Sequence, residues 1–186
     1  MSKLEWKPGT MVYPVPAVMV SCGDMEKANI ITVAWTGTIC TDPAMTYISI
    51  RPERYSYEII KNTKEFVINL TTKELAYATD FAGVKSGAEI DKFETLGLTK
   101  EKANKVSCPL IKESPLNIEC EVVEIKELGS HHMFIAKVLC VDADEKYMDE
   151  KNRFCLEKCN LMAYSHGQYY ELGDNLGKFG FSVKKK

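Results

Sequence analysis

Residues 29–70 constrain the fold of this chain more than any other stretch of its sequence. They begin with a β-branched run at 30–33 that continues to Trp35, and β-branched and aromatic residues favour the pleated surface of a strand. A small polar cluster follows at 36–38. The Asp42-Pro43 pair then predicts a turn, because proline fixes its own φ and pushes the preceding residue out of the helical region.

A second strand is predicted over residues 46–51, because its side chains alternate between two faces. One face carries Thr46, Ile48 and Ile50, and the other carries Tyr47, Ser49 and Arg51. Pro52 ends this strand. Ser56 is then placed to cap a short helix over residues 57–62, and a third strand is predicted at 66–70.

This order places a cation, Arg51, and a hydroxyl, Ser56, beside the start of a helix. Helix N-termini present unpaired N–H groups and a partial positive charge, so they are ready sites for phosphate. A capping box from Ser56 would require Glu or Gln at position 59, where this chain has Ile59. Two simpler roles stay open: Ser56 only caps the helix, and Arg51 pairs with Glu53 in solvent.

Five short motifs occur in a fixed order in this region. They are NIITVAW at 29–35, Asp42-Pro43, ISIRP at 48–52, Ser56 and FVINL at 66–70. Together they resemble the FMN-binding core of the flavin reductase-like family, and in particular its flavoredoxin-like branch. The resemblance implies a split β-barrel that forms a homodimer, with FMN lying between the barrel and elements of the partner subunit.

The rest of the chain predicts further strands and few helices. Strands are expected at 17–21, 116–125, 132–143 and 161–170, with a hairpin turn at Gly129. The strand at 116–125 is expected to be half exposed, with Glu119 on the face opposite Ile118 and Cys120. A helix is expected between Thr72 and Gly83, because Leu75, Ala78 and Ala82 form an apolar stripe.

Strands that follow one another without regular intervening helices argue against a doubly wound parallel sheet. We therefore expect a mainly β (α+β) fold, an FMN-binding split β-barrel with a few short helices. It is predicted to form a single domain over residues 1–186, with an irregular, glycine-containing C-terminal tail.

Composition excludes several classes of partner. The net charge is −2 with a pI near 6.0, which gives no electrostatic reason to expect nucleic acid, and the basic tip at 184–186 is expected to be solvated. No run reaches the roughly 18 apolar residues of a membrane span, and the N-terminus lacks the apolar core of a signal peptide. Seven scattered cysteines predict reduced thiols in a cytoplasmic protein rather than a disulfide framework or a metal site.

The resemblance also implies a contact segment for FMN, or for the dimer interface, at 86–93. Its pattern Ser-Gly-x-x-x-Asp-Lys-Phe nominates Ser86 and Lys92, and Lys85 more weakly. Without the resemblance, the same segment is a solvated connector. In the family a Gly-x-His segment leads into a strand, which here nominates His131 as the catalytic residue that lines the flavin or nicotinamide pocket. Alone, His131 and His132 are an ordinary turn feature, and Lys137 stands where relatives often carry Glu.

The strand that ends at Trp35 is expected to pass the flavin ring. Main-chain groups of Ala34 and Thr36 would bond the polar edge of the ring, and Thr32 would reach the ribityl chain. The simpler role for Trp35 is that of a core side chain. The complete set of cofactor-binding residues expected from the resemblance is Thr32, Ala34, Trp35, Thr36, Ser49, Arg51, Ser56, Tyr57, Ser86, Lys92 and His131.

The expected function is that of an FMN-binding oxidoreductase of the NAD(P)H:flavin reductase or flavoredoxin type. Electrons would pass through FMN from a nicotinamide or from a protein donor. The chain lacks the GxGxxG fingerprint of a Rossmann site, and it has no P-loop, GxSxG or HExxH motif. Two alternatives stay open: a non-enzymatic FMN-binding electron carrier or sensor, and a split-barrel oxidase of the pyridoxamine phosphate type.

Overall fold

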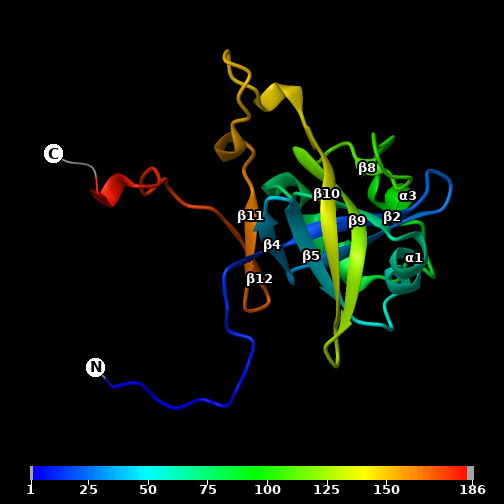
Figure 1. The fold of residues 1–186 in the computed structure, drawn as a ribbon, viewed down its shortest axis with the longest axis horizontal. Helices are drawn as coiled ribbons and strands as arrows, with labels where there is room; N and C mark the ends of the chain where they lie inside the picture. Colours follow the sequence, from blue (N-terminus) through cyan, green and yellow to red (C-terminus); the bar gives the residue numbers. More distant parts are fainter. Residues whose placement is uncertain (1, 184–186) are drawn as a thin grey trace.

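A computed structural model describes residues 2–183, so the basic tip at 184–186 lies outside the described residues. The molecule is a mainly β structure built around one seven-stranded antiparallel sheet (Figure 1). The strands of this sheet are β2 (Val18–Gly23), β3 (Ala28–Val33), β4 (Thr36–Thr41), β5 (Ala44–Ile50), β6 (Glu65–Asn69), β9 (Leu116–Glu127) and β10 (His132–Ala143). Their order in the sheet is β3-β2-β6-β9-β10-β5-β4. These features confirm the predicted fold class.

The two edge strands of the sheet, β3 and β4, follow each other directly in the sequence. Only Ala34 and Trp35 separate them, so the sheet must curl until its edges meet. The amide of Ser49 on β5 donates to the carbonyl of Trp35 at 2.8 Å, which extends the β4–β5 pairing as far as this bend. The seam of the barrel therefore lies at Trp35.

The strand predicted to run through Trp35 ends earlier, at Val33, because the chain bends there to reach the other edge. The polar cluster at 36–38 is the start of a strand that the sequence patterns did not predict, β4. Strand β4 forms a hairpin with β5 across the Asp42-Pro43 turn, which confirms the predicted turn. The predicted alternation in β5 is also confirmed, since Thr46, Ile48 and Ile50 are buried.

The barrel interior is filled by side chains from most strands and from the first helix, α1 (Tyr55–Thr63). Phe66, Phe134, Ile48 and Ile60 are completely buried there. A second apolar cluster lies between β3 and two further helices, α2 (Ala76–Val84) and α3 (Lys92–Leu96). Short helices thus cover the part of the sheet that ends at the seam.

The helix starts differ from the predictions at two places. Helix α1 begins at Tyr55 with Arg54 at the N-cap position, so Ser56 lies inside the first turn and does not cap the helix. The reason is a tertiary contact, because the buried Ser56 hydroxyl accepts a hydrogen bond from Asn29. Helix α2 follows a 3₁₀ turn at Lys73–Leu75 and continues past Gly83 to Val84.

The long hairpin of β9 and β10 is confirmed, with Gly129 at φ 94° in its turn and β10 spanning the predicted residues. The predicted exposure of Glu119 is wrong. Its side chain is completely buried, because it accepts hydrogen bonds from the amides of residues 104–106.

The single strand predicted at 161–170 is a hairpin of two strands, β11 (Met162–Ser165) and β12 (Gln168–Glu171). The chain reverses at His166-Gly167, where both residues have positive φ, and β11 also pairs with β1 (Val15–Pro16). Two more short strands, β7 (Lys100–Glu101) and β8 (Leu110–Ile111), pair with each other.

Both terminal segments project away from the barrel in Figure 1. They carry large exposed apolar side chains, with Trp6 75% exposed and Phe179 fully exposed. No helix within residues 2–183 is both long and apolar enough to cross a membrane.

Candidate functional site

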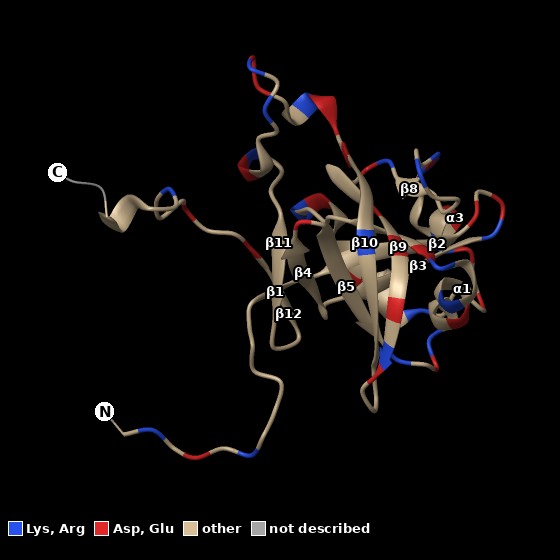
Figure 2. Ribbon diagram, viewed as in Figure 1, with Lys and Arg blue, Asp and Glu red and all other residues tan. Residues whose placement is uncertain are grey.

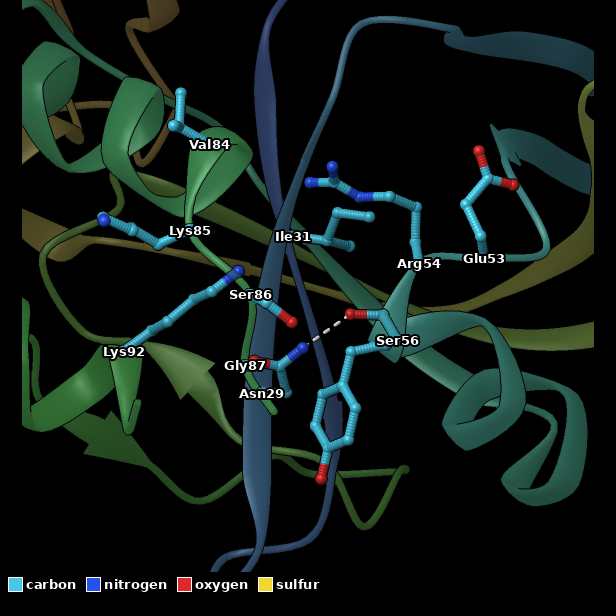
Figure 3. A pocket seen from close by; sticks show the side chains of 11 residues that line it. Asn29, Ile31, Glu53, Arg54, Ser56, Val84, Lys85, Ser86, Gly87 and Lys92 are labelled. Atoms are coloured by element: carbon cyan, nitrogen blue, oxygen red, sulfur yellow. Dashed lines mark hydrogen bonds between the residues drawn. The ribbon is translucent and has the colours of Figure 1, made fainter. Parts of the chain in front are cut away.

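Two cavities lie side by side next to the seam of the barrel. The first has a volume of about 190 Å³ and is lined by Asn29, Ile31, Glu53, Arg54, Tyr55, Ser56, Val84, Lys85, Ser86, Gly87 and Lys92 (Figure 3). The second has a volume of about 230 Å³ and is lined by Ile31, Thr32, Val33, Ala34, Trp35, Ser49, Ile50, Arg51, Arg54, Gly83 and His131. Ile31 and Arg54 belong to both linings, so the cavities share a wall.

Arg54 is the central cation of this region. It follows the turn after β5 and precedes the first residue of α1, and its guanidinium donates to the carbonyl of Gly83 at 2.5 Å. That bond ties the start of α1 to the last turn of α2. The sequence analysis missed Arg54, although its place at the start of the predicted helix was a signal that could have found it.

The first cavity is cationic and rich in hydrogen-bonding groups. Arg54 enters it from the start of α1, and in Figure 3 Lys92 approaches from the opposite side, with Lys85 and Ser86 on the connecting segment. The side-chain amide of Asn29 donates to the Ser56 hydroxyl at 2.7 Å. A small anion would therefore meet positive charges and hydroxyl groups in this cavity.

Gly87 is needed for the segment to approach β3 this closely. A Cβ atom at position 87 would lie 2.0 Å from the side-chain oxygen of Asn29, well inside van der Waals contact. The segment at 86–93, predicted as a contact segment or a solvated connector, is thus packed against β3 and lines the cavity.

Lys92 is buried and connects β3 to α2. Its ammonium donates to the carbonyls of Ile30 on β3 and Ala82 on α2, both at 2.7 Å. Burial, followed by the neighbouring positive charge of Arg54, lowers the pKa of Lys92 from 10.5 to about 8. The ammonium therefore fixes α2 against β3 while contributing positive charge to the first cavity.

The second cavity brings together six of the predicted residues. Their side chains or backbones come from the end of β3, the bend at 34–35, the end of β5 and the turn before β10; they are Thr32, Ala34, Trp35, Ser49, Arg51 and His131. The Thr32 hydroxyl donates to the carbonyl of Thr79 on α2 at 2.5 Å. Trp35 is half-buried, and its ring centroid lies 6.1 Å from that of Tyr13.

Arg51 and His131 form the polar rim of this second cavity. Arg51 pairs with Glu53 at 3.3 Å, and both side chains are more than half exposed. This is the solvent-exposed ion pair that was predicted as the alternative to phosphate binding by Arg51. The pKa of His131 lies below its usual value, mainly because the side chain is partly buried and to a smaller extent because Arg51 is positively charged. The imidazole is therefore neutral at pH 7 and can donate or accept a hydrogen bond.

Thr36 and Tyr57 do not line either cavity. The Thr36 hydroxyl donates to the carbonyl of Tyr47 at 2.6 Å, within the β4–β5 hairpin. Tyr57 is buried, and its phenol oxygen lies 2.7 Å from Nδ1 of His132. Each hydroxyl is thus engaged in holding elements of the barrel together.

The fold agrees with what comparison with known proteins finds. The family model of the flavin reductase like domain matches residues 10–173. The chain belongs to the flavin reductase-like family. Flavoredoxin of Desulfovibrio vulgaris (Miyazaki F) is similar over 98% of this chain and 100% of its own, with a TM-score of 0.90 and 28% identity.

Two further comparisons extend this result. An uncharacterized protein of Pyrococcus abyssi is 35% identical over 136 residues, which are 73% of this chain and 78% of that protein. The FMN-binding protein of Thermus thermophilus, solved with bound 1-cyclohex-2-enone, shares the fold with a TM-score of 0.81 at 21% identity, over 96% of this chain and 99% of that one. The expected resemblance is therefore confirmed, and with it a flavin-binding redox role and the split-barrel fold.

The buried Lys92 predicts a pH dependence of stability. Because its pKa is about 8 when folded and 10.5 when unfolded, the unfolded chain binds more protons between these values, and stability rises as pH increases across this window. Lys92→Met removes this contribution. In thermal melts, the melting temperature of the wild type should rise relative to that of the variant from pH 8 to pH 10. A difference in melting temperature that stays constant over this range would contradict the lowered pKa of Lys92.

Proposed function

We propose that this protein is an FMN-dependent oxidoreductase that passes electrons from a nicotinamide or a protein donor through bound FMN. The proposal rests on the two neighbouring cavities that share Arg54 in their linings. The first cavity is cationic, and the second is lined by the aromatic side chain of Trp35. FMN has the same polarity, since a phosphate at one end is joined by a hydroxylated chain to a planar ring at the other. The bound flavin supplies the redox chemistry.

The first cavity would take the phosphate. Arg54 and Lys85 supply charge, and Ser56 and Ser86 supply hydroxyl groups. The first turn of α1 adds the partial positive charge of a helix N-terminus. This assignment moves the main phosphate contact from Arg51 to Arg54, since the guanidinium of Arg51 is more than half exposed and paired with Glu53.

The second cavity would take the ribityl chain and the ring. Thr32 and Ser49 lie where hydroxyl groups of the ribityl chain would pass, and Trp35 lies at the seam, where its face can meet the ring. His131 stands on the rim, where its neutral imidazole would bond a polar edge of the ring. Lys92 would mainly hold α2 against β3, because its ammonium donates to the backbone carbonyls of Ile30 and Ala82.

We also propose that the protein works as a homodimer in the cytoplasm. Strands β4 and β5 contain no charged residue, and Figure 2 shows them as a region of the barrel without red or blue. Exposed apolar side chains lie on β4, β9 and β10, at Ile39, Val123, Leu139 and Val141. A second copy of the chain would cover this face.

The proposed cytoplasmic location rests on the cysteines. All seven cysteines are free thiols, as a reducing compartment favours.

The first experiment is the visible absorbance spectrum of the purified protein, with mass identification of any compound that denaturation releases. Flavin bands and released FMN support the proposal, whereas a protein that is colourless and fails to bind added FMN contradicts it. Turnover of NADH or NADPH with FMN then separates the enzyme from the carrier or sensor, because a carrier shows no turnover with either donor. Light scattering of the same sample measures the oligomeric state.

Arg54→Ala should weaken FMN binding by about 1.5–3 kcal/mol, roughly 10- to 150-fold, because a charge-assisted bond to phosphate is lost. Riboflavin has no phosphate, so its weaker binding should change much less. Arg153→Ala is the matched control, since it removes an exposed arginine that pairs with Asp149. Equal losses for FMN and riboflavin would mean that Arg54 acts only by joining α1 to α2.

His131→Gln should leave FMN bound and flatten the pH dependence of flavin reduction below pH 7. The pKa of His131 lies below its usual value, so the wild-type imidazole gains its charge only at acidic pH. Stopped-flow reduction measured from pH 5 to pH 8 gives this profile. If His131→Gln shows the same pH profile as the wild type, His131 has no role in flavin reduction and is only part of the turn.

A further inference from the structure

Three chemically active side chains lie together on the β9–β10 hairpin, outside both cavities described above. They are Glu119, Cys140 and Asp142, whose polar atoms all lie within 4.8 Å of one another. Glu119 and Cys140 are direct partners across the two strands. Nothing in the flavin chemistry uses this cluster, so its composition calls for a separate explanation.

The hydrogen bonds of Glu119 are those of an ionised carboxylate. Its Oε1 accepts from the amide of Asn104 at 2.8 Å, and its Oε2 accepts from the amides of Lys105 and Val106 at 2.6 and 3.0 Å. Three N–H donors on a side chain with no exposed surface favour the charged form. One lone pair of Oε1 is left free by these bonds.

The two carboxyl oxygens of Asp142 have different surroundings. Its Oδ1 accepts from the side-chain amide of Asn104 at 2.6 Å and from the thiol of Cys140 at 3.7 Å. Its Oδ2 is shielded from solvent and has no hydrogen-bond partner. A carboxylate oxygen buried without a donor beside a second carboxylate would be costly, whereas a protonated Oδ2 can donate to Glu119.

We propose that Glu119 and Asp142 share one proton, with Asp142 as the acid and Glu119 as the carboxylate, and that this proton fastens the 104–106 loop to the β9–β10 hairpin. Asn104 contacts both members of the pair, through its backbone to Glu119 and its side chain to Asp142. The loop in turn covers a small apolar cluster that includes Ala103, Val106 and Val67. Loss of the proton would place two negative charges together beneath this loop.

The charged side chains nearest to this pair do not form an ion pair with it in the described part of the chain. Around the adjacent opening lie Lys102, Lys112, Glu101, Asp144 and Glu145. Among the described residues, no ion pair joins either lysine to the carboxyl pair, and Asp144 pairs with Lys146 instead. Burial, followed by the bond to Glu119, raises the pKa of Asp142, in agreement with the geometry.

The sign of the pH dependence follows from the shared proton. The folded protein holds a proton on Asp142 at pH values where the unfolded chain has released it, so this pair costs stability as pH rises above the ordinary range of an aspartate. Asp142→Asn supplies a permanent N–H donor to Glu119 in nearly the same shape. The variant should melt at the wild-type temperature near pH 4 and a few degrees above it at pH 8.

Glu121→Gln is the matched control, because it removes one exposed carboxylate from the same strand and should show no such change with pH. Infrared spectra of the purified full chain provide a direct readout. A carbonyl band of a protonated carboxyl group should be present in the wild type at pH 7 and absent from Asp142→Asn.

Two results would overturn the proposal. One is a variant that is less stable than the wild type by the same amount at every pH, with no loss of the infrared band. The other is a wild-type protein, freed of metal by a chelator, that Zn²⁺ or Mn²⁺ stabilises at pH 8 through Asp142, since the site would then hold a cation in place of the proton.

Discussion

The structure depends on the closure of one sheet at Trp35. Strands β3 and β4 are neighbours in the sequence and lie at opposite edges of the sheet, so the two residues between them must carry the chain across the gap. The bond from the Ser49 amide to the Trp35 carbonyl extends the β4–β5 pairing up to this crossing. Side chains from β3, β5 and the turn before β10 meet at this seam, which is why the second cavity forms at this place.

The helices at the seam are held by buried and part-buried polar contacts as well as by apolar packing. The ammonium of Lys92 joins β3 to α2, the guanidinium of Arg54 joins α1 to α2, and Asn29 joins β3 to Ser56. These groups contribute positive charge and hydrogen-bond donors around the first cavity. The contacts that position the helices therefore also set the charge around this cavity.

Residues of the same type that lie near each other in the sequence have different environments in this fold. His131 lines the second cavity, whereas His132 lies in β10 and its ring nitrogen is 2.7 Å from the phenol of Tyr57. Arg51 is half exposed and paired with Glu53, whereas Arg54 borders both cavities. The reason is geometric, because one step along a strand or a turn points a side chain to a different face. Residue type alone does not reveal such a difference.

The sequence by itself determined the local structure and the family. The β5 alternation, the Asp42-Pro43 turn and the extent of β10 follow from local preferences, and short-range patterns record those preferences directly. Six predicted residues of the second cavity, and Ser56, Ser86 and Lys92 of the first, were also named from motifs. Only the tertiary structure decided that the polar cluster at 36–38 is an edge strand, that Ser56 bonds Asn29 instead of capping α1, and that Glu119 is buried. Each of these depends on a partner elsewhere in the sequence, such as Asn29, which lies 27 positions before Ser56, and a local pattern contains no record of that partner.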